Sequence, residues 1–283
     1  MNDNDGGLKD ILTSHGFRFS KSMGQNFLID PHIPERIAEE SGITDDMHVL
    51  EIGPGIGALT KHLCRRAGFV TAIELDKALP PILAETLAAF PNHEIISGDA
   101  LKLDIAELMQ RKSEYTRFAV CANLPYNITA PILAKLLECG IFESLTVMVQ
   151  REVAMRMTAK PGTSDYGAFT VFINYHTNPQ RLFDVPPGCF MPAPKVTSSV
   201  VRMVTKPQPP EIHDRDKFLK VVKASFSQRR KMLVNTLMPI CGGMTKNEVT
   251  KIVTACGINA QARGETLGIP EFAALARVIF PEK

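Results

Sequence analysis

The chain has 283 residues, of which 45% are hydrophobic and 22% charged, an ordinary composition for a soluble globular protein. No apolar run approaches the roughly 20 residues that cross a membrane, and the polar, acidic N-terminus is unlike a secretory signal. We therefore expect a cytoplasmic protein, and no coiled-coil heptad suggests more than a monomer. The net charge of +2 hides a split, because residues from 206 onward carry +6 and the remainder −4.

The six cysteines are scattered along the chain. None forms a C-x-x-C pair, and no histidine cluster has the spacing of metal ligands. We expect reduced cysteines that pack as small hydrophobes, and no metal site.

Residues 1–45 form an expected N-terminal arm, with a short helix at 8–12, a basic loop at 18–28 and a helix that starts at Pro31 and ends at Gly42. Beyond the arm, short apolar runs alternate with helical patterns, which is typical of a parallel, doubly wound sheet. The expected strands are 49–52, 69–75, 94–97, 118–122 and 145–149, and the expected helices begin at 58 or span 77–90, 104–112 and 131–139.

The pattern changes after residue 150. A helical stretch at 151–158 precedes two strand-like runs, 169–175 and 196–204, which predict an antiparallel edge on the sheet. Lys206–Pro210 is the best linker, and the helices expected beyond it are 214–238, 245–256 and 270–279. We predict domains at 1–205 and 206–283, the second small and helical. Its positive charge fits either a polyanionic partner or a plain solvated face.

The first strand runs into a glycine turn, Gly53-Pro54-Gly55-Ile56-Gly57. Glycines at every second position let the backbone turn sharply and let a ligand approach closely. In a nicotinamide enzyme the ligand would be a pyrophosphate, but the spacing is G-x-G-x-G rather than G-x-G-x-x-G. The carboxylate of S-adenosylmethionine (SAM) suits the turn equally well, and a merely structural turn is the alternative.

Two acids lie where the next strands end. Glu74 comes 21 residues after Gly53, where an acid accepts hydrogen bonds from both ribose hydroxyls of a nucleoside cofactor. The alternative for Glu74 is a capping acid beside Asp76. Asp99 either accepts from an adenine amino group or caps the next helix.

Asn123-Leu124-Pro125-Tyr126 ends the fourth strand, at the edge where open α/β sheets bind ligands. Pro125 stiffens the turn and forces Leu124 to be extended, so the Asn123 side chain and the Leu124 carbonyl can point at one place. Tyr126 offers a flat face on which a base can stack. An ordinary Asn-capped turn is the alternative, and the preceding glycine turn and acids favour function.

With these motifs the chain resembles the ribosomal RNA adenine N6,N6-dimethyltransferases, and within them the bacterial small-subunit (16S) branch. The narrowest motifs are Gln25–Leu28, Asn123–Tyr126 and Phe190–Val196. The resemblance implies a Rossmann-like α/β SAM-dependent methyltransferase fold, mostly parallel with an antiparallel edge, and a small all-helical C-terminal domain. It also implies N6,N6-dimethylation of two adjacent adenosines in the 3′-terminal hairpin loop of 16S rRNA, in the 30S subunit or its precursor, with a role in 30S biogenesis.

The resemblance also implies roles for single residues. Asn26 and Leu28 close over SAM, and Asn123 lies at the junction of cofactor and target amine. The implied cofactor-binding residues are Asn26, Leu28, Gly53, Glu74, Asp99 and Asn123. The implied catalytic residues are Asn123, Leu124, Tyr126 and Phe190, the two aromatic rings sandwiching the target adenine. The RNA-binding candidates are Lys21, Lys195, Arg229, Arg230 and Lys231.

Three rival functions stay open. A 23S rRNA adenine methylase of the macrolide-resistance type shares the core, although the C-terminal motifs favour the small-subunit enzyme. Intact SAM-site residues argue against a non-catalytic assembly or binding factor. A nicotinamide oxidoreductase disagrees with the glycine spacing and lacks a proton relay.

Overall fold

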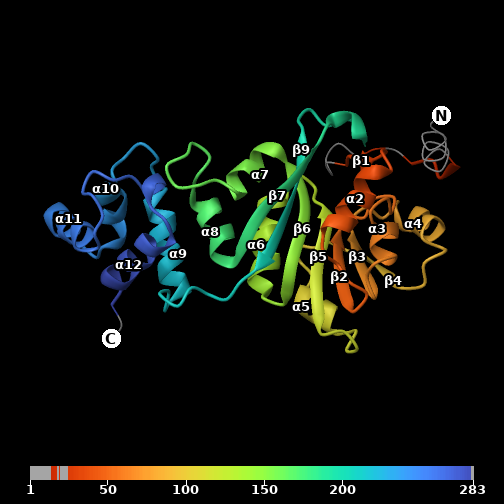
Figure 1. Ribbon diagram of the computed structural model, residues 1–283, viewed down its shortest axis with the longest axis horizontal. Coiled ribbons are helices and arrows are strands. Elements are labelled where there is room, and N and C mark those ends of the chain that lie inside the picture. Colours follow the sequence, from red (N-terminus) through yellow and green to blue (C-terminus); the bar gives the residue numbers. More distant parts are fainter. Residues whose placement is uncertain (1–13, 18, 20–24, 282–283) are drawn as a thin grey trace. The chain divides into compact units, whose positions relative to one another are not determined.

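Figure 1 shows the computed structural model, which describes residues 14–17, 19 and 25–281. The helix expected at 8–12, the RNA-binding candidate Lys21 and much of the basic loop lie outside these residues. The chain divides into two compact units. The first comprises the described residues up to Ala154 together with Gln180–Thr205, and the second comprises Met155–Pro179 and the chain from Lys206. The chain thus passes between the units at 154/155, 179/180 and 205/206, and the last of these is the boundary between the two predicted domains.

A seven-stranded sheet runs through the first unit in the order β4-β3-β2-β5-β6-β9-β7. The strands are β2 (Met47–Ile52), β3 (Phe69–Glu74), β4 (His93–Ser97), β5 (Arg117–Asn123), β6 (Phe142–Gln150), β7 (Thr177–Val185) and β9 (Ser198–Thr205). Strands β2 to β6 pair in parallel, and β9 pairs antiparallel with β6. The predicted parallel sheet with an antiparallel edge is confirmed.

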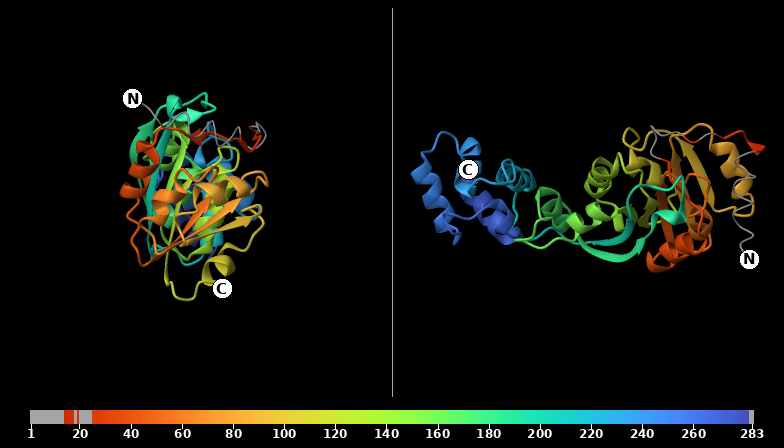
Figure 2. Two further views of the ribbon diagram at one scale, coloured as in Figure 1. Left: turned by 90° about the vertical axis from the view of Figure 1, so that its right-hand side faces the viewer. Right: turned by 90° about the horizontal axis from the view of Figure 1, so that it is seen from above.

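Helices cover both faces of this sheet (Figure 2). They are α2 (His32–Glu40), α3 (Thr60–Cys64), α4 (Pro80–Thr86), α5 (Ile105–Gln110), α6 (Thr129–Cys139) and α7 (Arg151–Met157). On one face, Val49 of β2 lies in an apolar cluster with Ile37 of α2 and Leu63 of α3. Strand β2 is buried at every position, as a strand covered on both faces must be.

The chain order reverses beside β2, with β3 and β4 on one side and β5 and β6 on the other. In open α/β sheets, ligands bind in the crevice at such a point, outside the carboxyl ends of the strands. The glycine turn after β2, Glu74 at the end of β3 and Asn123 at the end of β5 therefore meet at one edge.

A separate two-stranded sheet pairs β1 (Phe27–Leu28) antiparallel with β8 (Phe190–Met191), placing Leu28 opposite Phe190. The Ile29 N–H extends the pairing by donating to the Cys189 carbonyl at 2.9 Å. Cys189 ends the 3₁₀ turn η2 (Pro187–Cys189) that precedes β8. This sheet joins the arm to the segment between β7 and β9.

The second unit contains the helices α8 (Ala168–His176), α9 (Arg215–Ser225), α10 (Leu233–Leu237), α11 (Lys246–Ala255) and α12 (Ile269–Ile279), with the 3₁₀ turns η3 (Met238–Ile240) and η4 (Gly264–Thr266). The strand expected at 169–175 is wrong, because this run is helix α8. Val171 and Tyr175, one helical turn apart, both lie in the apolar core of the unit. Tyr175 stacks on Phe218 of α9, with ring centroids 5.4 Å apart.

The single helix expected at 214–238 is also wrong, because α9 ends at Ser225 and α10 begins at Leu233. Serine hydroxyls bond the last carbonyls of α9: Ser225 Oγ donates to Val221 at 2.8 Å, and Ser227 Oγ to Ala224 at 2.7 Å. The helices expected at 245–256 and 270–279 are confirmed as α11 and α12. Among the described residues, no helix has the length and apolar character needed to cross a membrane.

Candidate active site

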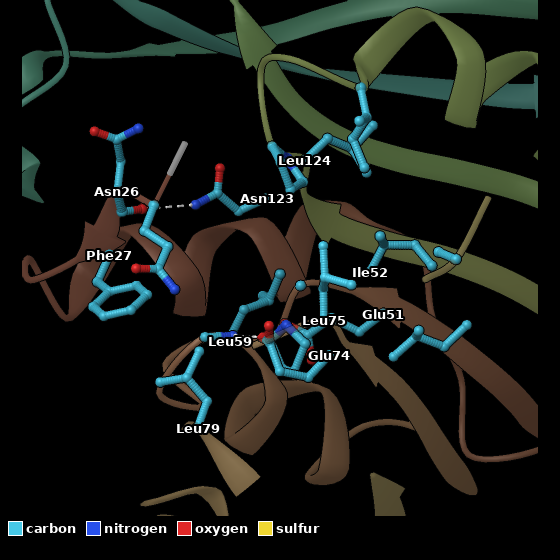
Figure 3. A pocket seen from close by; sticks show the side chains of 18 of the residues that line it. Asn26, Phe27, Glu51, Ile52, Leu59, Glu74, Leu75, Leu79, Asn123 and Leu124 are labelled. Atoms are coloured by element: carbon cyan, nitrogen blue, oxygen red, sulfur yellow. Dashed lines mark hydrogen bonds between the residues drawn. The ribbon is translucent and has the colours of Figure 1, made fainter. Parts of the chain in front are cut away.

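A cleft opens at the carboxyl ends of β2, β3 and β5, and arm residues 25–28 form one of its walls (Figure 3). The cleft brings together eight of the predicted site residues: Asn26, Leu28, Gly53, Glu74, Asp99, Asn123, Leu124 and Tyr126. The chain segments that carry them are far apart in sequence, so the fold assembles the site.

The glycine turn forms the floor of this cleft. Gly53, Gly55 and Gly57 have φ angles of +68°, +60° and +82°, which side-chain-bearing residues rarely adopt. A Cβ atom on Gly55 would lie 3.0 Å from the Phe27 ring of the arm. The turn therefore needs glycine both for its backbone angles and for the close approach of the arm.

Glu74 joins the end of β3 to the glycine turn. Its Oε2 atom accepts from the Gly55 N–H at 3.2 Å, and its Oε1 atom from the Asp76 N–H at 2.8 Å. Burial raises the pKa of the carboxyl, and these backbone donors lower it. A carboxylate has about four lone-pair positions, so it keeps acceptor capacity for a ligand in the cleft.

Asp99 follows β4 and lines the same cleft. Its Oδ1 atom accepts from the Leu101 N–H at 3.0 Å, and its Oδ2 atom lies 3.7 Å from Lys102 Nζ. The side chain that caps α5 is Asp104, which accepts from Glu107 N. The alternative of a helix cap at Asp99 is therefore wrong.

Asn123 faces the arm across the cleft. Its Nδ2 atom donates to the Asn26 carbonyl at 3.2 Å. Because a carbonyl can only accept, this bond uses one N–H of the NH₂ group and turns the amide oxygen away from Asn26 (Figure 3). The Leu124 N–H donates to the Met148 carbonyl at 3.1 Å and fixes the turn to β6.

The two aromatic rings of the predicted adenine sandwich differ in position. Tyr126 lines the cleft, and its hydroxyl lies 2.6 Å from Ser198 Oγ. Phe190 is only 3% exposed, packs in an apolar cluster with Leu28 and Val185, and is not among the cleft-lining residues. The pairing of β8 with β1 holds Phe190 there, so its contact with a base stays a prediction.

Glu51 is a site residue that the sequence analysis gave no role. It lies on β2, is 1% exposed and lines the cleft. Burial raises its pKa to about 8. The Thr60 hydroxyl beside the carboxyl lowers this pKa, but in the part of the chain that the structure describes Oε2 has no partner with hydrogen-bond geometry. An acid inside an apolar strand was the available sequence signal, and a buried acceptor in a cleft suits a cationic ligand.

The RNA-binding candidates fall into different settings. The Arg229 guanidinium donates to the carbonyls of Ser164 and Tyr166, which gives it a structural contact in the second unit. Arg230 and Lys231 are exposed on the turn between α9 and α10. The fourth candidate described, Lys195, is exposed in the loop after β8.

Among the described residues, no three His, Cys, Asp or Glu side chains are grouped to hold a metal ion.

Comparison with known proteins decides the family. The family model described as ribosomal RNA adenine dimethylase matches residues 16–276. The chain belongs to this family. Ribosomal RNA small subunit methyltransferase A of Geobacillus thermodenitrificans is 45% identical to it over 281 residues, covering 98% of this chain and 96% of that protein. The protein of that name from Alkaliphilus oremlandii is 44% identical, covering 95% and 94%.

Solved structures of similar fold include two proteins named as a methyltransferase and a dimethyladenosine transferase. The 23S rRNA methyltransferase ErmE is 27% identical with a TM-score of 0.69, covering 89% of this chain and 98% of that one. A dimethyladenosine transferase from Plasmodium falciparum has a TM-score of 0.73 at 23% identity, covering 88% and 95%. The predicted family and the predicted methyltransferase fold are confirmed.

Proposed function

We propose that this family member uses SAM to dimethylate the amino groups of two adjacent adenosines in the 3′-terminal hairpin loop of 16S rRNA. The observation that carries the proposal is the meeting of the glycine turn, Glu74 and Asn123 in one cleft. The relatives named as small subunit methyltransferases are 44–45% identical, against 27% for the 23S enzyme, which favours the small subunit.

The residues of the cleft fit SAM. Acceptors for a cationic, hydroxyl-bearing ligand come from Glu51, Glu74 and Asp99, and apolar contact from Leu75 and Leu79. Glu51 Oε2, which has no partner of hydrogen-bond geometry among the described residues, would accept from a ligand ammonium. When bound, SAM supplies an electrophilic methyl group on a positively charged sulfur.

The chain's own task is to hold the target amine. An adenine amine is a poor nucleophile, because its lone pair is delocalised into the ring. Asn123 Oδ1 and the Leu124 carbonyl accept its N–H bonds and bend it toward tetrahedral geometry, which exposes the lone pair. The bond from Asn123 Nδ2 to Asn26 orients the amide for this role. No strong base is needed, since the methylated amine becomes acidic and gives its proton to water, so positioning and electrostatics carry the catalysis.

The target base must leave its stack to reach this cleft. Tyr126 supplies the stacking face, and Arg230 and Lys231 of the C-terminal unit contact the RNA. We propose a cytoplasmic monomer that acts without a metal on the 30S subunit or its precursor, with a role in its biogenesis.

Transfer of tritiated methyl groups from SAM to undermethylated 30S particles tests the function. Labelled dimethyladenosine in the 16S rRNA is expected. Undermethylated 50S particles serve as the comparison substrate. Labelling of 23S rRNA instead, or of neither RNA, would refute the proposal.

Glu51 should make SAM binding depend on pH. With a pKa of about 8, its carboxyl is mostly protonated at neutral pH. A cation bound beside it lowers that pKa and releases a proton, so SAM affinity rises with pH up to about 8. Calorimetry in two buffers of different ionisation enthalpy should detect more proton release for the wild type than for Glu51→Gln. Equal proton release by both proteins would contradict this assignment.

The same ionisation has a stability signature. The unfolded Glu51 carboxyl ionises near its ordinary value of 4.5, whereas the folded one stays protonated to about 8. The unfolded state therefore loses its proton first, and the free energy of unfolding falls as pH rises through this window. Glu51→Gln should remove that part of the fall, which thermal unfolding at pH 5 and pH 8 measures.

Arg230 and Lys231 should contact RNA phosphates. Neutralising both as Arg230→Gln/Lys231→Gln should lower the slope of log K against log salt by about 1 to 2, since each phosphate contact contributes about 0.7–0.9. Lys246→Gln/Lys251→Gln, on exposed positions of α11, is the charge-matched control. An unaltered slope in the Arg230→Gln/Lys231→Gln variant would leave these two residues as plain surface charges.

Arg229→Gln should instead lower the melting temperature, because the Arg229 guanidinium bonds two loop carbonyls.

A further inference from the structure

A short hydrogen bond ties Tyr126 to the sheet. Its hydroxyl oxygen lies 2.6 Å from Ser198 Oγ. Ser198 is fully buried and begins β9, where it pairs with Gln150 of β6. Tyr126 stands on the turn after β5, half-buried, with the cleft beside it. The bond thus links a side chain on a turn to a residue that the sheet holds in place.

Stacking a base requires only the aromatic ring, so the hydroxyl of Tyr126 must serve another purpose. A phenolic O–H prefers the plane of its ring, so a partner on the oxygen fixes both the far end of the ring and its tilt. The near end is fixed as well, because Ile128 N and Thr129 Oγ1 both donate to the Pro125 carbonyl, at 3.2 and 3.1 Å. The ring is therefore held at both ends.

We propose that Ser198 is a positioning residue for methyl transfer: it holds the Tyr126 ring at the angle at which the target adenine stacks. The inference rests on the proposed function. Because the stacked base carries the amine, the tilt of the ring sets where the amine lies relative to Asn123. Small misplacements of reacting groups slow a reaction steeply, so the buried serine acts on the rate through the tyrosine.

The test compares variants that remove the bond but keep the ring. Ser198→Ala and Tyr126→Phe each delete one partner. The matched control is Ser199→Ala, the next residue of the same strand, also fully buried, whose hydroxyl donates to Asp184 Oδ1 at 2.6 Å. For each variant, kcat on undermethylated 30S particles, the Kd for SAM and the melting temperature are measured.

Each single variant should lower kcat about 3- to 10-fold, the effect of one net hydrogen bond, with the Kd for SAM unchanged. The double variant Tyr126→Phe/Ser198→Ala should be no slower than the single ones, because both remove the same bond. Ser198→Thr keeps a hydroxyl and suits a strand, so it should recover most of the rate. Ser199→Ala should retain the wild-type kcat.

Additive losses in the double variant would overturn the inference, as would equal losses in the Ser198→Ala and Ser199→Ala proteins. The wild type is assayed first. If it fails to methylate 30S particles, the proposed function fails. If it is active and Ser198→Ala is equally active, only the role of Ser198 fails.

Discussion

Replacement of Asn123 by alanine should lower the rate of methyl transfer by about 100- to 1000-fold, the usual cost of removing one group that stabilises a transition state. In the proposed mechanism the amide oxygen is the acceptor that reshapes the target amine, and alanine offers none. The Kd for SAM should change far less, because Glu74, Asp99 and the glycine turn remain. Single-turnover methylation with SAM in excess measures the first quantity, and calorimetry the second.

Asn178→Ala provides a control, since this asparagine is exposed on β7, is not among the cleft-lining residues and has no part in the proposed mechanism. Its turnover should stay close to that of the wild type. Turnover of Asn123→Ala at the wild-type level would refute the mechanism. A loss of SAM affinity as large as the loss of rate would instead assign Asn123 to cofactor binding alone.

Glu74→Ala should have the opposite profile, weakening SAM about 100-fold while leaving turnover at saturating SAM within a few-fold of wild type. Two charge-assisted hydrogen bonds to ribose hydroxyls, at about 1.5 kcal/mol each, correspond to this factor. Calorimetric titration of each variant with SAM gives the result directly. Glu74→Gln, which keeps the shape but not the charge, should fall between the two.

The Glu74 side chain also accepts from Gly55 and Asp76, so loss of the turn has to be separated from loss of the ligand contact. Melting temperatures serve for this. Glu94→Ala is a matched control, since this acid lies on the neighbouring strand β4, bonds Thr71 and is not among the cleft-lining residues. Wild-type SAM affinity in Glu74→Ala would rule out the ribose contact.

The sheet and its crevice could be predicted because short segments of the sequence carry the signals for both. Strands buried on both faces are short, continuous apolar runs, as in β2. Glu74 and Asn123 each sit where such a run ends, so parallel topology alone brings both to the same edge. This reasoning needs no knowledge of side-chain packing, and for that reason it could predict most of the residues that line the cleft.

Features that depend on packing could not be predicted in this way. The run at 169–175 is short and apolar, so periodicity fits a strand or a buried helix equally, and only its packing around Phe218 selects the helix. Strand β1 spans two residues, Phe27–Leu28, which is too few for any pattern. The raised pKa of Glu51 likewise depends on how deeply β2 is buried, which its own sequence does not state.

The pairing of β1 with β8 should couple the binding of the two proposed substrates. Leu28 lines the cleft proposed for the methyl donor, and its strand partner Phe190 belongs to the segment expected at the acceptor base. A ligand that stabilises β1 in this pairing also stabilises β8. Such coupling is reciprocal by thermodynamic linkage. Donor and RNA should accordingly bind with positive cooperativity. Release of the arm from β8 should therefore lower the affinity for both.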